Sequence, residues 1–325
     1  MKKIFRRLKM LLRKLPSDSS WGVYFLRQAS FIWTWVNTVI FSFNKEERLN
    51  FYTNKNIFYR LSQKTAKIYD EIDNNEFNKK FLKNDMYDFN GIYLPKINDV
   101  RVLRLVYEDV LSIYTEKNDN YSYKFFDEVE KNSTEGPFCY VSPTGEDITV
   151  HKNDVVIDAG AWIGDFSAYC AKKKAFVYAF EPSLSNIKLL EKTIEYNKAE
   201  KYIKIAPYGL CDKEGLVNFN DAEQVSSNNI DINGNIQIKV ATLDNWAKEN
   251  NIKKIDFIKA DIEGQERNML LGAKEVLKKF QPTLSICTYH LIDDPEVLEK
   301  IILESNPNYK IIHKRMKLFA YVNKK

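Results

Sequence analysis

The C-terminal part of the chain alternates between segments that read as strands and segments whose hydrophobic residues recur at helical spacing. The strand segments lie at residues 154–158, 175–182, 203–210, 254–261 and 282–290, and the helically spaced segments lie at 183–197, 270–280 and 293–305. In the first strand segment, Val155, Val156 and Ile157 form a continuous hydrophobic run. Hydrophobic runs without polar alternation are typical of parallel strands that are covered on both faces. The alternation therefore predicts a three-layer α/β sandwich with a mostly parallel sheet.

The last hydrophobic segment, residues 309–322, reads as two strands around a charged turn. Such a terminal hairpin fits poorly with a dinucleotide fold, whereas it fits the S-adenosylmethionine (SAM) methyltransferase sheet, whose last strand is antiparallel. A nicotinamide fingerprint needs G-x-G-x-x-G, and counted from Gly160 these positions hold Gly160, Trp162 and Asp165. The predicted fold class is α/β, a seven-stranded Rossmann-like SAM-methyltransferase sandwich with an N-terminal helical extension.

Residues 154–164, DVVIDAGAWIG, predict a strand, a glycine turn and the start of a helix. This arrangement brings backbone N–H groups and a helix N-terminus against a ligand, although an ordinary tight turn would read the same way. Glu181 closes the next strand, where a carboxylate can accept hydrogen bonds from both hydroxyls of a ribose. Helix 183–197 is expected to begin with Ser183 or Ser185 as its cap.

Five segments resemble, in this order, the FkbM family of SAM-dependent methyltransferases. They are VVIDAGAWIGDFS, YAFEP, PYGLCDKEG, TLDNW and DFIKADIEGQERNMLLGA. The resemblance covers roughly residues 138–325, and the D-x-E-G-x-E run at 261–266 is its most specific part. It implies SAM as the cofactor and an O-methyltransferase that acts on hydroxyls of sugars, glycolipids or natural products.

The resemblance also implies which residues bind the cofactor and the acceptor. The expected cofactor-binding residues are Asp158, Gly160, Ala161, Trp162, Gly164, Glu181, Gly209 and Asp261. Trp162 departs from the family pattern, which more often has a small or amide residue there, and it could stack near the cofactor or point into the substrate cleft. His290 would close the substrate side.

A sulfonium methyl group is already activated, so the enzyme must align an oxygen nucleophile and remove its proton. We expect the base to be one of Asp261, Glu263 and His290, and His290 has the intrinsic pKa nearest neutrality. The alternatives are a structural histidine, an Asp261 that binds the cofactor's amino group, and a Glu263 that caps the helix starting near residue 265.

Asp261 and Glu263 are spaced so that they could hold a divalent cation, but two carboxylates alone do not justify a metal assignment, and none is made. Glu266 reads as a first-turn acid that favours the helix dipole. Lys259 is either a solvated strand end or a charge partner of Asp261. The histidines outside the expected site, His151 and His313, read as structural or exposed. The four widely spaced cysteines indicate a reducing compartment.

Three regions are predicted, namely 1–44, 45–135 and 136–325. The start of the first is rich in lysine and arginine, has no acidic residue before Pro16, and predicts a basic amphipathic helix that can lie on an anionic membrane surface. The aromatic residues that follow, up to 43, could equally pack on the protein's own body or on a second subunit. The region 45–135 is predicted to be polar and helical, and residues 138–150 to form a hairpin that turns at Thr144 and Gly145.

The leading hypothesis is a cytoplasmic O-methyltransferase of a glycan or lipid-linked glycan, held at the inner face of a membrane by residues 1–43. A non-catalytic SAM-fold scaffold and a methyltransferase of a small-molecule natural product are the alternatives, and a dehydrogenase is disfavoured by the failed glycine pattern. The net charge of +5 is mild, and we expect no nucleic-acid partner.

Overall fold

A computed structural model describes residues 75, 77–89, 91–97, 138–141, 146–221, 229–231, 233–314 and 316–323. The chain divides into two compact units after Glu76, and the described residues from Phe77 onward all belong to the second unit. The predictions made for residues 1–44, including membrane contact and association with a second subunit, lie outside the described residues. Within the described part of the chain, every helix is too short or too polar to cross a bilayer.

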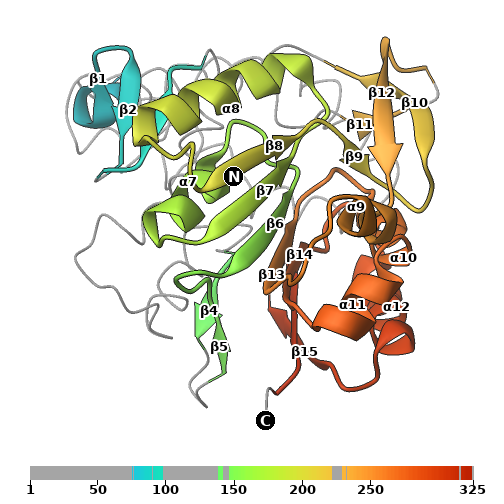
Figure 1. Cartoon of the computed structure of the whole chain (residues 1–325). Helices are drawn as coiled ribbons and strands as arrows, with labels where there is room; N and C mark the ends of the chain where they lie inside the picture. The colour runs from blue at the N-terminus through green and yellow to red at the C-terminus, as the bar shows by residue number, and fades with distance from the viewer. Residues whose placement is uncertain are drawn as a thin grey trace, which may run out of the picture. The chain divides into compact units, whose positions relative to one another are not determined.

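Seven strands form the central sheet, in the order β15-β16-β14-β13-β6-β7-β8 (Figure 1). The strands are β6 (Val155–Ala159), β7 (Phe176–Phe180), β8 (Ile203–Ala206), β13 (Phe257–Ala260), β14 (Thr283–Cys287), β15 (Lys310–Lys314) and β16 (Lys317–Tyr321). β14, β13, β6, β7 and β8 are parallel to one another, whereas β16 is antiparallel to both β14 and β15. The predicted α/β class, the seven strands and the antiparallel terminal hairpin are confirmed.

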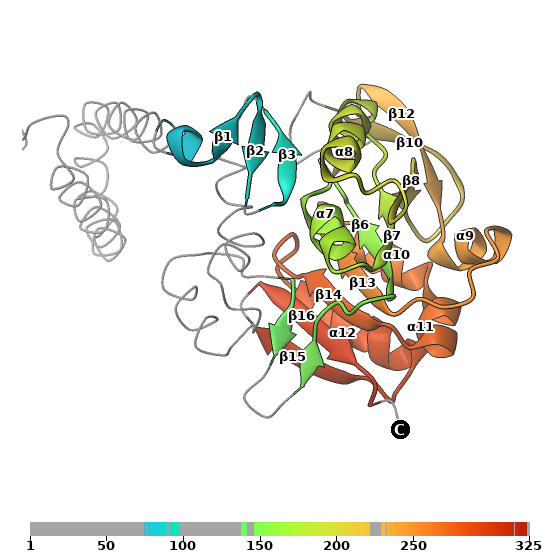
Figure 2. The same ribbon diagram turned by 60° about the vertical axis from the view of Figure 1, so that its left-hand side comes forward.

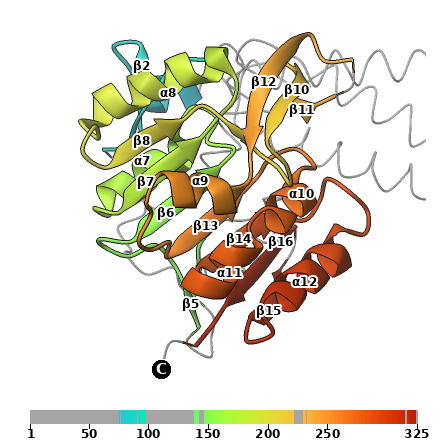
Figure 3. The same ribbon diagram turned by 45° about the vertical axis from the view of Figure 1, so that its right-hand side comes forward.

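Helices cover both faces of this sheet (Figures 2 and 3). They are α7 (Asp165–Lys172), α8 (Leu184–Asn197), α9 (Leu243–Glu249), α10 (Glu266–Leu271), α11 (Lys274–Phe280) and α12 (Asp294–Ser305). Val156 packs into the core that includes α7 and α8, and the next residue, Ile157, packs into the core that includes α9 to α12. Because successive side chains of a strand point to opposite faces, a continuous hydrophobic run is what a sheet buried on both faces requires.

Two local predictions have different outcomes. Ser183, one of the two predicted caps, is the N-cap of α8. Its hydroxyl oxygen accepts a hydrogen bond from the backbone N–H of Asn186. The single helix predicted over 270–280 is instead two helices, α10 and α11. A Cβ at Gly272, between them, would lie 2.1 Å from the backbone oxygen of Cys211. The chain therefore turns at a close backbone contact that its local sequence did not reveal.

Gly215 reads in the sequence as a turn that is followed by one short strand, and the structure has a second sheet there. The structure has four strands in the order β11-β10-β12-β9, and β10 itself begins at Gly215. These strands are β9 (Gly209–Leu210), β10 (Gly215–Asn220), β11 (Asn229–Ile230) and β12 (Ile236–Ala241). Phe219, Ile238 and Val240 are buried together with Cys211 on this sheet.

Of the region 45–135, which is predicted to be polar and helical, the structure describes residues 75, 77–89 and 91–97. Residues 77–81 are helical, and strands follow them. Strands β1 (Leu82–Lys83), β2 (Met86–Asp88) and β3 (Tyr93–Pro95) form an antiparallel sheet. Asn84 and Asp85 both have positive φ angles of 50° and 61°, which suits a tight hairpin turn. The Asn197 side chain on α8 accepts a hydrogen bond from the backbone N–H of Tyr93 and donates one to its carbonyl. This small sheet therefore packs on the same unit as the central sheet, across the boundary that was predicted near residue 136.

The predicted hairpin around residues 138–150 is confirmed. Strand β4 (Tyr140–Val141) pairs antiparallel with β5 (Asp147–Ile148), while the turn predicted at Thr144 and Gly145 lies outside the described residues.

Candidate functional site

A cavity opens at the carboxyl ends of β6, β7 and β13. Gly160, Glu181 and Asp261, each just beyond the end of one of these strands, line one wall, and Phe219 and Ile238 of the second sheet line the other. The strand order reverses between β6 and β13, because β7 follows on one side of β6 and β13 lies on the other. Ligands of open α/β sheets bind at such a reversal.

Glycine is needed at two positions of the loop between β6 and α7. Gly160 has a φ of 73°, and a Cβ there would lie 2.0 Å from the backbone oxygen of Asp261. Gly164 is the N-cap of α7 with a φ of 86°, and a Cβ there would lie 2.3 Å from a methyl group of Leu190. The loop therefore follows a path that only residues without a side chain permit at these points. This explains the predicted strand, glycine turn and helix in physical terms.

Trp162 occupies the middle of this loop. Its side chain is 7% exposed, belongs to the core beneath α7 and α8, and contributes to the cavity wall. The indole N–H is buried without a hydrogen-bond partner among the described residues. The backbone N–H of Trp162 donates to Oε2 of Glu181 at 2.9 Å. Trp162 therefore contributes to the cavity wall, and its backbone N–H holds the carboxylate of Glu181 in place.

Glu181 is buried but well supplied with donors. Its Oε1 accepts from the backbone N–H of Ser183 at 2.9 Å and from the side chain of Asn186 at 3.4 Å. Burial raises the pKa of Glu181 to about 7, although the hydrogen bonds from Ser183, Trp162 and Asn186 oppose this shift. A carboxylate has about four lone-pair positions, so further hydroxyl donors in the cavity can still bind to it. Asn186, which also lines the cavity, was not identified from the sequence.

Asp158 lies beneath the loop and does not line the cavity. It is fully buried, its Oδ1 lies 3.2 Å from Nζ of Lys259, and its Oδ2 accepts from the hydroxyl of Ser167 at 2.6 Å. Lys259 also donates to the backbone oxygen of Gly160 at 2.6 Å. The reading of Lys259 as a solvated strand end is therefore wrong, because it joins β13 to the glycine loop inside the protein. Of the other predicted cofactor-binding residues, Ala161 and Gly164 also lie away from the cavity wall, whereas Gly209 is on it.

Asp261 follows β13 and faces several donors and positive charges. Tyr289 donates its hydroxyl to Oδ1 of Asp261 at 3.0 Å. Burial would raise the pKa of Asp261, but Lys259, Lys317 and His290 outweigh it and hold that pKa below its usual value. The ammonium groups of Lys259 and Lys317 also lie 5.1 Å and 4.2 Å from the ring centre of Phe138.

Sequence reasoning missed Tyr289 and Lys317, which both act on Asp261. Tyr289 directly precedes His290, and Lys317 stands in the charged turn region of the terminal hairpin. Neither position carries a local signal, because Lys317 reaches Asp261 only when β16 lies beside β14.

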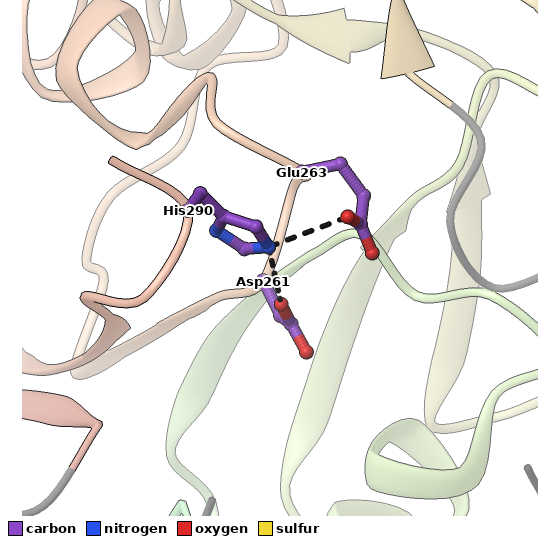
Figure 4. A group of neighbouring side chains, drawn as sticks. All are labelled: Asp261, Glu263 and His290. Carbon is purple, nitrogen blue, oxygen red and sulfur yellow. Dashed lines mark ion pairs between the residues drawn. The ribbon is translucent and has the colours of Figure 1, made fainter. Parts of the chain in front are cut away.

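Asp261, Glu263 and His290 come together and form what we call the Asp–Glu–His cluster (Figure 4). Nε2 of His290 lies 3.7 Å from Oδ1 of Asp261 and 3.4 Å from Oε2 of Glu263. On the other side of the ring, Nδ1 lies 3.2 Å from Oε1 of Glu266. The structure thus brings together all three residues that were predicted to serve as a base. Asp261 and Glu263 line the cavity, and His290 stands behind them.

The charge of His290 is set by its neighbours. Burial alone would lower its pKa, but Glu263, Glu266 and Asp261 together raise it to about 10. The environment thus moves the pKa of His290 well away from its intrinsic value near neutrality. Glu263 also does not cap a helix, because the N-cap of α10 is Gln265. Instead, Glu263 has a positive φ of 53°, a conformation that is uncommon for a residue with a side chain and is often found at functional sites.

The remaining predicted features agree with the structure. His151 and His313 are on the surface in ion pairs with Asp147 and Glu299. All four cysteines are buried and free.

Comparison with known proteins adds the family. The sequence profile described as "Methyltransferase FkbM domain" matches residues 152–317, just over half of the chain. Among curated proteins, the chain is 26% identical over 163 residues to the hexuronic acid methyltransferase AglP of Haloferax volcanii, covering 49% of this chain and 66% of that protein.

Two solved structures are also similar in fold. One is methyltransferase FkbM from Methylobacillus flagellatus, with 20% identity, a TM-score of 0.46, and coverage of 79% of this chain and 60% of that one. The other is a SAM-dependent O-methyltransferase from Thermotoga maritima, with 16% identity, a TM-score of 0.34, and coverage of 54% and 62%. Because the family profile covers half of the chain and spans the glycine loop, Glu181 and the Asp–Glu–His cluster, the chain belongs to the FkbM family of methyltransferases.

Proposed function

We propose that this protein is a SAM-dependent O-methyltransferase that methylates a hydroxyl group of a glycan or lipid-linked glycan. One observation carries the proposal: a single cavity has a buried carboxylate, Glu181, at the end of β7 and two carboxylates of the Asp–Glu–His cluster beyond β13. Glu181 can hold the ribose of a nucleoside, and the carboxylates of Asp261 and Glu263 can receive a proton next to it.

On the cofactor side, Glu181 accepts the ribose hydroxyls while Gly160 lets the backbone approach the rest of the cofactor. Tyr208, Phe219 and Ile238 line the same cavity and provide an apolar surface for the adenine ring. SAM supplies a methyl group on a positively charged sulfur, and the chain's own residues have to place that methyl group near Asp261.

On the acceptor side, the hydroxyl oxygen forms a bond to the methyl carbon while the bond from that carbon to sulfur breaks. The products are a methyl ether and S-adenosylhomocysteine, and the hydroxyl proton is taken up by a carboxylate of the Asp–Glu–His cluster, because the raised pKa of His290 keeps its ring protonated. Positioned proton acceptors of this kind contribute about 10²- to 10⁴-fold to a rate.

The acceptor class rests on the relative from Haloferax volcanii, whose name states that it methylates a hexuronic acid. A sugar hydroxyl is a weak nucleophile, which suits a cavity with several acids next to the transferred methyl group. The free, buried cysteines agree with a reducing compartment such as the cytoplasm.

Glu181→Gln tests the cofactor site. Loss of the carboxylate charge should weaken S-adenosylhomocysteine binding by about 1.5–3 kcal/mol, which is roughly ten- to hundredfold. Because burial raises the pKa of Glu181 to about 7, the wild-type affinity should also fall as the pH drops from 8 to 6, since protonation removes the acceptor. Calorimetry at several pH values measures both effects.

The variant Glu181→Gln should show a flat affinity over this pH range, and Glu191→Gln, an exposed position on α8, should behave like the wild type. An unchanged affinity in Glu181→Gln would remove Glu181 from the cofactor site. Absence of S-adenosylhomocysteine binding to the wild type would contradict the proposed function itself.

His290→Gln tests the acceptor side. Turnover should fall by about 10²-fold, because the variant lacks the positive charge that holds the Asp261 and Glu263 carboxylates in place, while S-adenosylhomocysteine binding stays within a factor of two to three. The measurement is transfer of a labelled methyl group to a panel of uronic acids and neutral sugars. The matched control is His313→Gln, which removes a surface histidine paired with Glu299. Equal turnover in the two variants would exclude His290 from catalysis, and no labelled sugar in the panel would count against a glycan acceptor.

A further inference from the structure

The His290 side chain is buried among three carboxylates, and its contacts with them are 3.2 Å or longer. It is 9% exposed, and neither ring nitrogen has a hydrogen-bond partner of good geometry among the described residues. Nε2 is directed at Asp261 and Glu263, as Figure 4 shows. Burying a polar group without a hydrogen bond costs about 1–3 kcal/mol. A nitrogen aimed at two carboxylates can exchange its proton for a cation that the same two carboxylates bind.

We propose that Asp261, Glu263 and His290 bind a divalent cation. One oxygen from each carboxylate and one nitrogen of His290 all lie within 4.8 Å of one another. Around an octahedral Mg²⁺ ion with bonds of about 2.1 Å, adjacent ligand atoms lie roughly 3 Å apart and opposite ones about 4.2 Å apart. The separations of 3.4 Å and 3.7 Å from Nε2 are close to the first value, so small side-chain rotations complete the site.

The surroundings of the three side chains hold them as metal ligands are usually held. A metal-binding histidine almost always donates its other ring N–H to a carboxylate or carbonyl, and here Nδ1 lies 3.2 Å from Oε1 of Glu266. Glu266 is 1% exposed and is itself fixed by the backbone N–H of Ile262 at 2.8 Å. Tyr289 orients Asp261 through its hydroxyl. Oδ1 of Asp261 accepts from Tyr289 and also faces Nε2 of His290, and a carboxylate oxygen has a second lone pair with which it can bind a cation.

The ligand set selects the kind of ion. Two carboxylate oxygens and one imidazole suit Mg²⁺ or Mn²⁺, whereas structural zinc sites mostly have four protein ligands, often thiolates. The ion would also compensate the negative charge of three converging carboxylates. Lys259 and Lys317 already supply positive charge on the side of Asp261. Lys259, however, is paired with Asp158, with 3.2 Å between Nζ and Oδ1.

The role of the ion rests on the proposed function. Three protein ligands leave about three octahedral positions open, and two neighbouring oxygens of a sugar can occupy two of them. A hydroxyl bound to the cation loses its proton to a water molecule or a neighbouring carboxylate more readily, and its oxygen then attacks the methyl group of SAM. The cation is neither oxidised nor reduced.

Binding of Mn²⁺ alone to the full-length protein tests the inference without an activity assay. We expect one Mn²⁺ per chain in an electron paramagnetic resonance titration, and at least about tenfold weaker binding in Glu263→Gln. Glu191→Gln, which removes an exposed carboxylate on α8, is the matched control and should bind like the wild type. Pulsed measurements should show coupling of the ion to a histidine nitrogen, and His290→Gln should abolish that coupling.

Equal Mn²⁺ binding in the wild type and Glu263→Gln would mean an adventitious ion only and would overturn the inference, as would the absence of saturable binding. Far-ultraviolet circular dichroism of each variant shows whether it is folded, and the nitrogen coupling in the wild type gives a result that needs no variant. S-adenosylhomocysteine calorimetry on the same samples separates the two proposals. If that ligand binds and Mn²⁺ does not, the metal site fails and the proposed function stands.

Discussion

Lys259→Met should lower the free energy of unfolding by about 3–5 kcal/mol, which is the usual cost of removing one partner of a buried ion pair. Asp158 is fully buried, and Lys259 lies 3.2 Å from it and donates to Gly160 at 2.6 Å. Methionine keeps most of the volume but leaves the Asp158 carboxylate without its counter-charge. Urea denaturation followed by tryptophan fluorescence measures the loss.

The surface lysine Lys254 provides the comparison. It pairs with Asp256 at 2.8 Å with about half of its side chain exposed (53%), so Lys254→Met should cost less than about 1 kcal/mol. Adding Asp158→Asn to Lys259→Met should recover part of the stability, because the unpaired charge is then removed. Similar losses in the two lysine variants would show that the buried pair does not matter for stability.

Gly160→Ala should prevent cofactor binding and lower the free energy of unfolding by about 3 kcal/mol or more. The added Cβ would lie 2.0 Å from the backbone oxygen of Asp261, and neither backbone can move freely because both belong to the central sheet region. To relieve the contact, the glycine loop must move away from Asp261. This movement separates the cofactor loop from the acceptor side of the cavity.

Gly91→Ala controls for the backbone conformation alone. Gly91 has a φ of 83°, close to the 73° of Gly160, but its added Cβ would meet only the end of the Lys172 side chain, at 3.1 Å. We expect a cost of about 1 kcal/mol and an unchanged affinity for S-adenosylhomocysteine, measured by calorimetry. If Gly160→Ala binds that ligand as well as Gly91→Ala does, the close approach of the loop to Asp261 has no role in the site.

The central sheet could be predicted from the sequence because its strands are buried on both faces. Val155, Val156 and Ile157 form a continuous hydrophobic run, and Glu181 and Asp261 follow strand ends that could be recognised in the same way. Helix α8 could be placed because its hydrophobic spacing and its cap, Ser183, are local features.

The small strands could not be predicted, because some are too short to show a hydrophobic period and others depend on distant pairing partners. Strands β1 to β3 have two or three residues each, and β9 pairs with β12, whose partner residues lie about thirty positions away. The break at Gly272 likewise depends on the distant backbone of Cys211. A pattern read over neighbouring residues has no information about such contacts.

The sequence by itself determined the order of the central strands, the glycine turn, and the acids that follow the strands, because each depends on neighbours along the chain. It also named Asp261, Glu263 and His290. Only the tertiary structure decided that Asp158 supports the loop from inside, and that His290 lies among three carboxylates with its pKa raised to about 10. Charge and proton affinity depend on distances between side chains of different elements, and those distances exist only once the sheet and its loops have assembled.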